Sequence, residues 1–186
     1  MIPFNDIKVK EKFESYPDNI ILKLYRLREL IFDVASKEET ILNIEETLKW
    51  NEPSYITKNG STLRIDWKKT NPYQYSMYFN CKTTLVRTFE ELFSDKFTFV
   101  NNREIMFSID EKIDEKILKY CILLSLTYQD RKHLNMLDKE WVYNNYLEEK
   151  QAYTAIDQGF FYCLEKTGNQ KKKVQKSASP SRASLW

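Results

Sequence analysis

The dipeptide Asn59-Gly60 strongly constrains the fold of this chain, because alternating apolar and polar residues flank it on both sides. Asn-Gly is the preferred pair for a two-residue type I′ turn, in which both turn positions need a positive φ angle. The segments before and after it, SYITK and STLRIDW, are therefore predicted to form a β-hairpin. With a two-residue loop, Tyr55 pairs with Arg64 across this hairpin.

The hairpin is predicted to have a core face and an outward face, since successive side chains of a strand point to opposite sides. The core face consists of Ile56, Leu63, Ile65 and Trp67. The outward face consists of Tyr55, Thr57, Thr62, Arg64 and Asp66, and it continues onto a third strand through Ser76 and Tyr78. This outward face is the extended surface on which a binding function is expected.

Two helices are predicted before the hairpin. The first begins after Tyr16-Pro17-Asp18, because Pro17 pushes the preceding residue out of the helical region and Asp18 can cap the free amides. Apolar residues then recur at steps of three and four, which predicts one buried stripe: Ile20, Leu24, Leu27, Leu30, Ile31 and Val34. The second helix is predicted from Glu38 to Trp50, and Pro53 prevents its continuation.

Three strands and two helices are predicted after the hairpin. The strands span residues 74–79, 97–100 and 104–109, and the helices span residues 83–93 and 114–129. The predicted fold class is α+β, an antiparallel sheet of about five strands packed against helices. This domain is expected over residues 1–137, followed by a helical extension over 138–165 and a flexible basic tail over 166–186.

Charge and cysteine content bound the environment of the protein. Nowhere do 18 uncharged apolar residues run together, and the segment MIPFNDIKVKEKF has charges where a signal peptide needs an apolar stretch. The three cysteines, Cys81, Cys121 and Cys163, match neither a disulfide framework nor a CxxC zinc pattern. We therefore expect a cytoplasmic protein with reduced thiols and no membrane partner.

Five segments, in this order, resemble the YdhG-like domain family, a family of unknown function. They are LKWNEPSY (48–55), GSTLRIDW (60–67), MYFNCKTTLV (77–86), FTFVNNREIMF (97–107) and LTYQDRKHL (126–134). The resemblance implies an α+β fold in which helices cover an antiparallel sheet. Some members are described as frataxin-like iron chaperones, so the resemblance also implies iron as the candidate metal.

Carboxylates on the second predicted helix are the candidate metal ligands. Oxygen ligands bind iron weakly and reversibly, as delivery requires. The acidic residues on one side of that helix are Glu38, Glu39, Glu45 and Glu46. A solvated helix face is the alternative interpretation of these four residues. The first helix is a poor acidic ridge, because basic residues stand among its acids, and His133 is the only histidine of the chain.

Two turns depart from the pattern of the family in a way that the chain can tolerate. Asn51 and Asn101 stand where relatives tend to have glycine. Asn visits the left-handed region more readily than other non-glycine residues, so both turns are expected to persist.

The sequence contains no nucleophile motif, phosphate loop or zinc spacing, so the expected function is non-enzymatic. Cys81 is the candidate thiol, because it precedes a predicted helix whose free amides stabilise a thiolate; packing as a small apolar residue is the alternative. Arg103 could hold a carboxylate or phosphate with two donors, or tie down its own turn and the Cys81 loop. The candidate binding residues are Tyr55, Arg64, Tyr78 and Arg103.

Three functional hypotheses follow. The leading one is a binding or delivery protein, with iron chaperoning as the suggestion from the resemblance. The alternative is a protein-interaction module that uses the open sheet face or the C-terminal extension. The weakest is nucleic-acid binding by the tail, which has six basic residues and no acidic one over residues 166–186 but also has the composition of a disordered end.

Overall fold

The centre of the protein is an antiparallel sheet, seen in a computed structural model that describes residues 2–133. Six strands lie in the order β1-β2-β3-β4-β6-β5. Their bounds are β1 (Glu45–Lys49), β2 (Glu52–Ile56), β3 (Leu63–Trp67), β4 (Gln74–Tyr78), β5 (Thr98–Val100) and β6 (Glu104–Ser108). The predicted α+β class is therefore confirmed, while the extension and the tail predicted over residues 138–186 lie outside the described residues.

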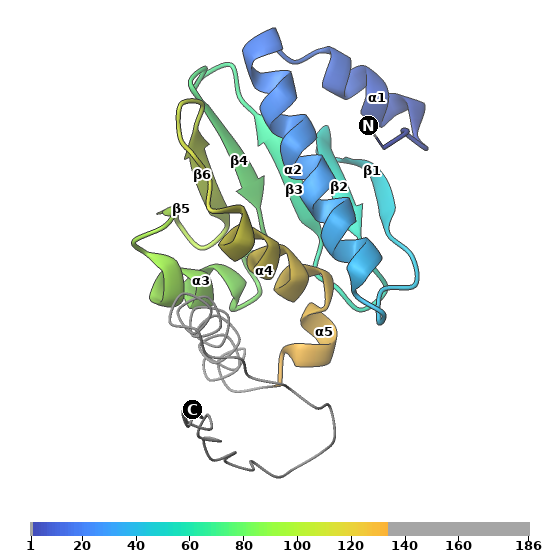
Figure 1. Ribbon diagram of the computed structural model, residues 1–186, viewed down its shortest axis with the longest axis vertical. Coiled ribbons are helices and arrows are strands. Elements are labelled where there is room, and N and C mark those ends of the chain that lie inside the picture. The colour runs from blue at the N-terminus through green and yellow to red at the C-terminus, as the bar shows by residue number, and fades with distance from the viewer. Residues whose placement is uncertain (1, 134–186) are drawn as a thin grey trace, which may run out of the picture. The chain divides into compact units, whose positions relative to one another are not determined.

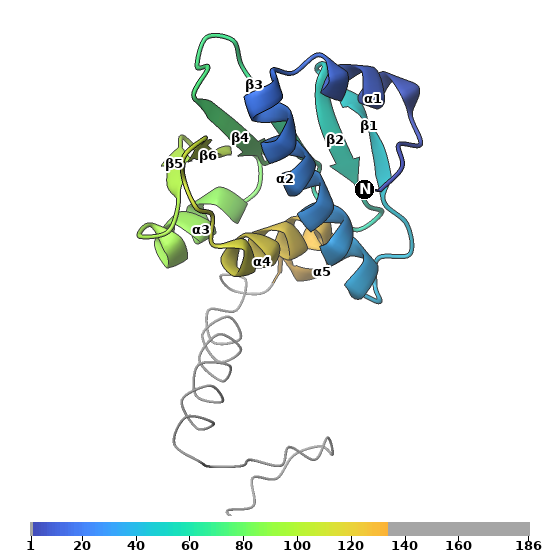
Figure 2. The ribbon, with the colours of Figure 1, turned by 45° about the horizontal axis from the view of Figure 1, so that its top comes forward.

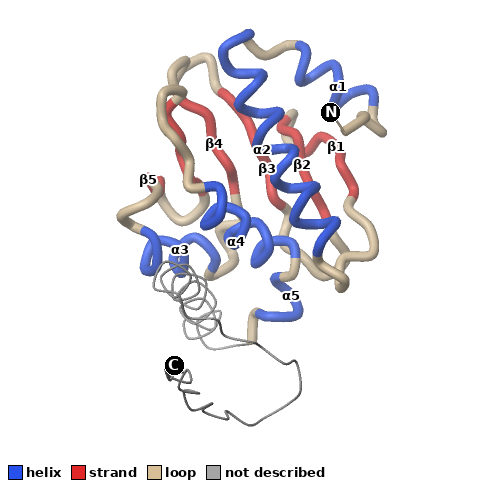
Figure 3. The backbone as a smooth tube through the Cα atoms, viewed as in Figure 1, coloured by secondary structure: helices blue, strands red, loops and turns tan. Residues whose placement is uncertain are grey.

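The long helix α2 (Asp18–Lys37) and helix α4 (Glu115–Leu126) lie across the same face of the sheet (Figure 1). Figure 2, turned by 45°, also shows α2 crossing in front of the strands, and the tube in Figure 3 repeats the view of Figure 1 with the strands in red behind α2. The six apolar residues predicted to form the buried stripe of α2 are all buried. The main core therefore lies between the sheet and the two helices.

Three shorter helices flank this two-layer arrangement. They are α1 (Ile7–Glu14), α3 (Leu85–Phe93) and α5 (Tyr128–Arg131). Helix α1 was not predicted, although the sequence contains its N-cap: a side-chain oxygen of Asp6 accepts a hydrogen bond of 2.8 Å from the Lys8 amide. Within the described residues, no helix combines the length and the apolar character that a membrane span requires.

The prediction of a helix from Glu38 to Trp50 is wrong. Helix α2 continues to Lys37, and residues 45–49 form the edge strand β1, in which Glu46 pairs with Tyr55 of β2. The apolar spacing at Ile41, Ile44 and Leu48 suggested a helix, but local propensity is a weak signal that strand pairing and burial override. The sheet therefore has one strand more than predicted.

The hairpin between β2 and β3 is confirmed, but its predicted loop and register are wrong. Tyr55 pairs with Leu63, and Ser54 pairs with Arg64, so the register differs by one residue from the prediction. A one-residue shift moves every side chain of a strand to the other face. Tyr55 is consequently in the core at 0% exposure, Ile56 is only half-buried, and Leu63 remains a core residue as predicted.

Glycine is required at position 60 because the backbone here lies close to the end of α4, and not because of a two-residue turn. A Cβ atom at this position would lie 2.7 Å from the carbonyl oxygen of Leu126 at the end of α4, and it would also collide with the Thr57 hydroxyl. The hairpin loop is held against α4 by a hydrogen bond of 2.8 Å from the Ser61 amide to the Ser125 carbonyl. Packing against α4 therefore determines the loop conformation.

The tight left-handed turn lies instead between β1 and β2. Lys49 pairs with Glu52, and the two intervening residues, Trp50 and Asn51, have φ angles of 58° and 61°. Asn101 also has a positive φ, 53°, so both asparagines adopt the conformation expected for them. Trp50 is the unexpected member, because a bulky residue is a steric outlier in this region.

Candidate functional site

The candidate site is a pocket of about 310 Å³ beside β3 and the segments that follow β1 and β4. Its lining is rich in basic and aromatic residues: Lys49, Trp50, Thr62, Arg64, Phe79, Asn80, Cys81 and Arg103. We call this the basic pocket. It brings together residues that are up to 54 positions apart, from Lys49 to Arg103, and only the folded sheet makes them neighbours.

Arg64 forms one wall of the basic pocket and points away from the core. It alternates with Leu63 and Ile65, which are both fully buried. One of its terminal nitrogens donates a hydrogen bond of 2.5 Å to Oε2 of Glu52, and its guanidinium lies 5.8 Å from the ring centre of Tyr78. The side chain of Arg64 remains 21% exposed, so part of the guanidinium is accessible.

Glu52 is the acidic partner of Arg64, and burial disfavours the charged form of its carboxylate. Burial raises the pKa of Glu52, and Asp66 raises it further, while Arg64 and two lysines act in the opposite direction. The raised pKa means that removal of water from the carboxylate outweighs the attraction of Arg64. Glu52 accepts one hydrogen bond from Arg64, so the other donors of the guanidinium are available to an additional anion.

Lys49 and Arg103 carry charges without an acidic partner. Within the described part of the chain, neither residue forms an ion pair. The Arg103 guanidinium has Nη2 at 3.8 Å from Sγ of Cys81, a long and weak contact. The Cys81 loop is held by Asn102 instead, whose side-chain amide donates a hydrogen bond of 2.9 Å to the Cys81 carbonyl. Arg103 therefore keeps most of its donors for another group.

Trp50 stands at the rim of the basic pocket with 87% of its surface exposed. Its left-handed backbone costs on the order of 1–3 kcal/mol for a residue other than glycine. Neither burial nor turn geometry explains a tryptophan here. The adjacent Asn51, a residue that favours tight turns, is a sequence signal for a turn at this position. The prediction of a helix up to Trp50 led to a different interpretation.

The four predicted binding residues have different positions. Arg64 and Arg103 both line the basic pocket. Tyr55 lies in the core on the opposite side of the sheet, where its ring stands perpendicular to that of Phe32 with the ring centres 5.9 Å apart. Tyr78 is only 6% exposed, and the charged ends of Arg64 and Lys68 lie 5.8 and 5.0 Å from its ring centre. The pair Tyr55 and Arg64 therefore does not form a shared recognition surface.

The four predicted metal ligands do not share a face, because residues 45–49 are a strand. Glu45 is exposed, whereas the adjacent Glu46 is buried on the other side of β1. Glu38 ends α2 and accepts a hydrogen bond of 2.7 Å from the Thr40 hydroxyl, and Glu39 is exposed in the next turn. Among residues 2–133, no group of three or more potential ligand side chains is placed to hold a metal ion. Iron delivery remains a prediction that rests on the resemblance.

Glu46 has a structural partner, the buried Arg28 of α2. The two side chains form hydrogen bonds of 2.6 and 2.8 Å, and they are 2% and 1% exposed. Two further donors of Arg28 reach the carbonyls of Ile2 and Pro3 at 2.7 and 3.0 Å. Arg28 therefore fastens the N-terminal segment, α2 and β1 together.

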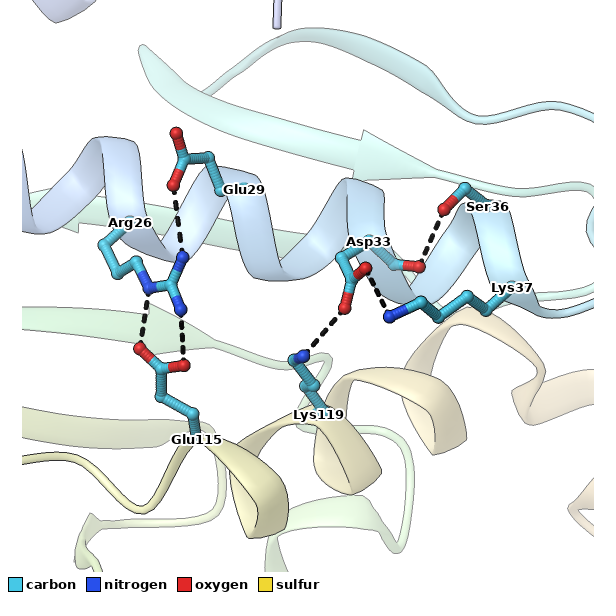
Figure 4. A network of polar contacts seen from close by, with 7 residues as sticks. All are labelled: Arg26, Glu29, Asp33, Ser36, Lys37, Glu115 and Lys119. Carbon is cyan, nitrogen blue, oxygen red and sulfur yellow. Dashed lines mark hydrogen bonds and ion pairs between the residues drawn. The ribbon is translucent and has the colours of Figure 1, made fainter. Parts of the chain in front are cut away.

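A second polar network joins α2 to α4 on the helical side (Figure 4). Arg26 contacts Glu115 with two hydrogen bonds, of 2.6 and 2.5 Å, and Lys119 contacts Asp33 at 2.7 Å. These contacts lower the pKa of Glu115 and of Asp33. The adjoining pocket of about 640 Å³ is larger than the basic pocket, but its lining has three basic and three acidic residues. Its charges balance, so it shows no preference for an anion.

Comparison with known proteins adds no relative: no family model, no curated protein and no solved structure matches the chain. The resemblance to the YdhG-like family therefore stays a prediction from the sequence.

Proposed function

We propose that the protein is a non-enzymatic binding protein that holds an anionic ligand in the basic pocket. The observation behind this proposal is the placement of Lys49, Arg64 and Arg103 around one pocket in which only Arg64 has an acidic partner. Two positive charges are thus left for a ligand. A phosphate or carboxylate is the group that fits such a lining, because planar guanidinium groups donate two parallel hydrogen bonds to these anions.

The lining of the basic pocket favours binding over catalysis. Its one thiol, Cys81, is exposed, and the described lining places no carboxylate or imidazole beside it to orient a substrate or to move a proton. Among the described residues that line the pocket, none is a histidine, aspartate or glutamate. The same lining supplies cationic and neutral donors, which hold an anion without changing it.

Membership of the YdhG-like family and a cytoplasmic location belong to the same proposal. The first is supported by the α+β fold with an antiparallel sheet, which agrees with what the resemblance implies. The second is supported by the free thiols of Cys81 and Cys121 in the described part of the chain, since disulfides are rare in the cytosol.

Calorimetric titration of the full chain with inorganic pyrophosphate tests the proposed function. Saturable binding is expected, and Arg103→Glu should weaken it by at least about tenfold, equivalent to about 1.4 kcal/mol. The matched control is Lys112→Glu, which makes the same charge change at an exposed residue of the charge-balanced pocket. Equal affinities of the two variants, or no saturable binding to the unchanged protein, would contradict the proposal.

A further inference from the structure

We infer that the ligand of the basic pocket is a nucleoside phosphate, whose base stacks on Trp50 and whose phosphate lies among Lys49, Arg64 and Arg103. The inference rests on the proposed anion binding and adds a second recognition element to it. Trp50 and the three cations line one pocket, so one ligand can contact both kinds of group.

The position of Trp50 is the first argument. An exposed tryptophan is explained neither by core packing nor by its own backbone, which has a φ angle of 58°. In a two-residue turn with two positive φ angles, glycine, asparagine and aspartate are the favoured residues. A strained outlier of this kind points to a ligand contact, and the flat face of an indole is a stacking surface for a planar base.

The size and the neutral lining of the pocket are the second argument. Small-molecule sites occupy roughly 300–1,000 Å³, and the basic pocket has about 310 Å³, which suits one nucleotide unit. Thr62 and Asn80 supply a hydroxyl and an amide, which can bond to a sugar hydroxyl or to the edge of a base. A free nucleotide and one residue of a single strand share this chemistry.

The test compares adenosine monophosphate with ribose 5-phosphate, which has the same phosphate and sugar but no base. Calorimetry of the full chain should show adenosine monophosphate binding at least about tenfold more tightly, because the stacking of a base on an aromatic side chain adds to the binding free energy. Trp50→Asn should remove this difference and leave the affinity for ribose 5-phosphate unchanged. Trp50→Phe should retain part of the difference, because a smaller aromatic face remains.

A purely structural role of Trp50 would give a different result. Asparagine tolerates positive φ, so Trp50→Asn should fold with an unchanged or raised melting temperature. A lower melting temperature together with an unchanged preference for adenosine monophosphate would overturn the inference and assign Trp50 to the turn.

The remaining outcomes separate this inference from the proposed function. Equal binding of the two phosphates, abolished by Arg103→Glu, would overturn base stacking while anion binding stands. No binding of either phosphate or of pyrophosphate would overturn both. A hexamer of adenylate that binds more tightly than the monophosphate would identify a single strand as the source of the nucleotide, and equal binding would identify a free nucleotide; both results support the site.

Discussion

Two arginine–glutamate pairs lie on opposite sides of the same three strands and have different surroundings. Arg28 and Glu46 are enclosed between α2 and β1, where the guanidinium is bonded at every nitrogen and lies 4.1 Å from the ring centre of Phe4. Arg64 and Glu52 share one hydrogen bond beside the basic pocket, and they are 21% and 13% exposed. The residue types are the same, but only the second pair has donors that a ligand can reach.

This difference shows how one kind of side chain takes a structural or a binding role. A buried ion pair whose guanidinium is bonded at every nitrogen is closed to a ligand, and removal of one partner alone is strongly destabilising. A partly exposed pair near further unpaired cations keeps both water and ligands within reach. Burial and the number of satisfied donors, and not the presence of arginine, therefore distinguish the two sites.

The largest effect is expected from Glu46→Gln. It leaves the buried charge of Arg28 without a counter-charge, so the free energy of unfolding should fall by about 3–5 kcal/mol. Urea unfolding followed by circular dichroism measures this. The matched control is Glu45→Gln, an exposed neighbour on the other side of β1, which should change stability by no more than about 0.5 kcal/mol.

A double variant keeps this prediction testable if Glu46→Gln does not fold. Arg28→Met with Glu46→Leu removes both charges and should recover most of the lost stability, because well-packed apolar residues can replace a buried ion pair. Similar losses of unfolding free energy for Glu45→Gln and Glu46→Gln would contradict a stabilising role of Glu46 as the buried counter-charge of Arg28.

The next effect concerns how the free energy of unfolding depends on alkaline pH through Tyr55, which lies on the side of the sheet that α2 covers. Burial, together with the nearby charge of Glu46, raises the pKa of Tyr55 well above its usual value of 10. The folded protein then keeps a proton that the unfolded chain releases, so this contribution is complete below pH 10 and is lost as the pH rises further. One proton per molecule corresponds to at most about 1.4 kcal/mol per pH unit.

Tyr55→Phe should therefore flatten the decline of stability above pH 10, measured by urea unfolding at several pH values. Tyr78, beside Arg64, has its pKa raised by burial to about 12, so its contribution changes only between pH 10 and about 12. Tyr73→Phe is the control, because it removes a hydroxyl from a side chain that is 71% exposed. An equal slope for Tyr55→Phe and Tyr73→Phe would contradict the enclosed position of Tyr55.

The smallest stability effect is expected from Glu52→Gln. The raised pKa of Glu52 indicates that the loss of water from its carboxylate outweighs the attraction of Arg64, so removal of the charge should change the free energy of unfolding by less than about 1 kcal/mol. The pyrophosphate affinity should rise instead, because the variant removes the acid that competes for Arg64. Calorimetry of this variant beside the unchanged protein measures the difference in affinity, and weaker pyrophosphate binding by Glu52→Gln would contradict the role assigned to Arg64.

Much of the fold could be predicted because its signals are local. The apolar stripe of α2 and the alternation along β3 and β4 place most of their core residues correctly, including Leu63 and Met77, but Trp67, which was predicted for the core face, is only half-buried. For the site, Arg64 and Arg103 were found from strand alternation and from a turn. Lys49 and Trp50 were not predicted, because the apolar spacing before them is typical of a helix. Residues 45–49 form a strand only through their pairing with β2, and the left-handed turn follows that strand.

The sequence by itself determined the α+β class, the long first helix of the core and the hairpin around Asn59-Gly60. The tertiary structure alone decided that residues 45–49 pair as an edge strand, that β2 shifts by one residue against β3, and that Gly60 packs on α4. The reason is physical: helix periodicity and strand alternation are properties of neighbouring residues, whereas register and burial of charge depend on partners distant in the chain. Glu46 is an example: it was predicted to face solvent, but the folded chain places it beside Arg28, where it is the buried counter-charge.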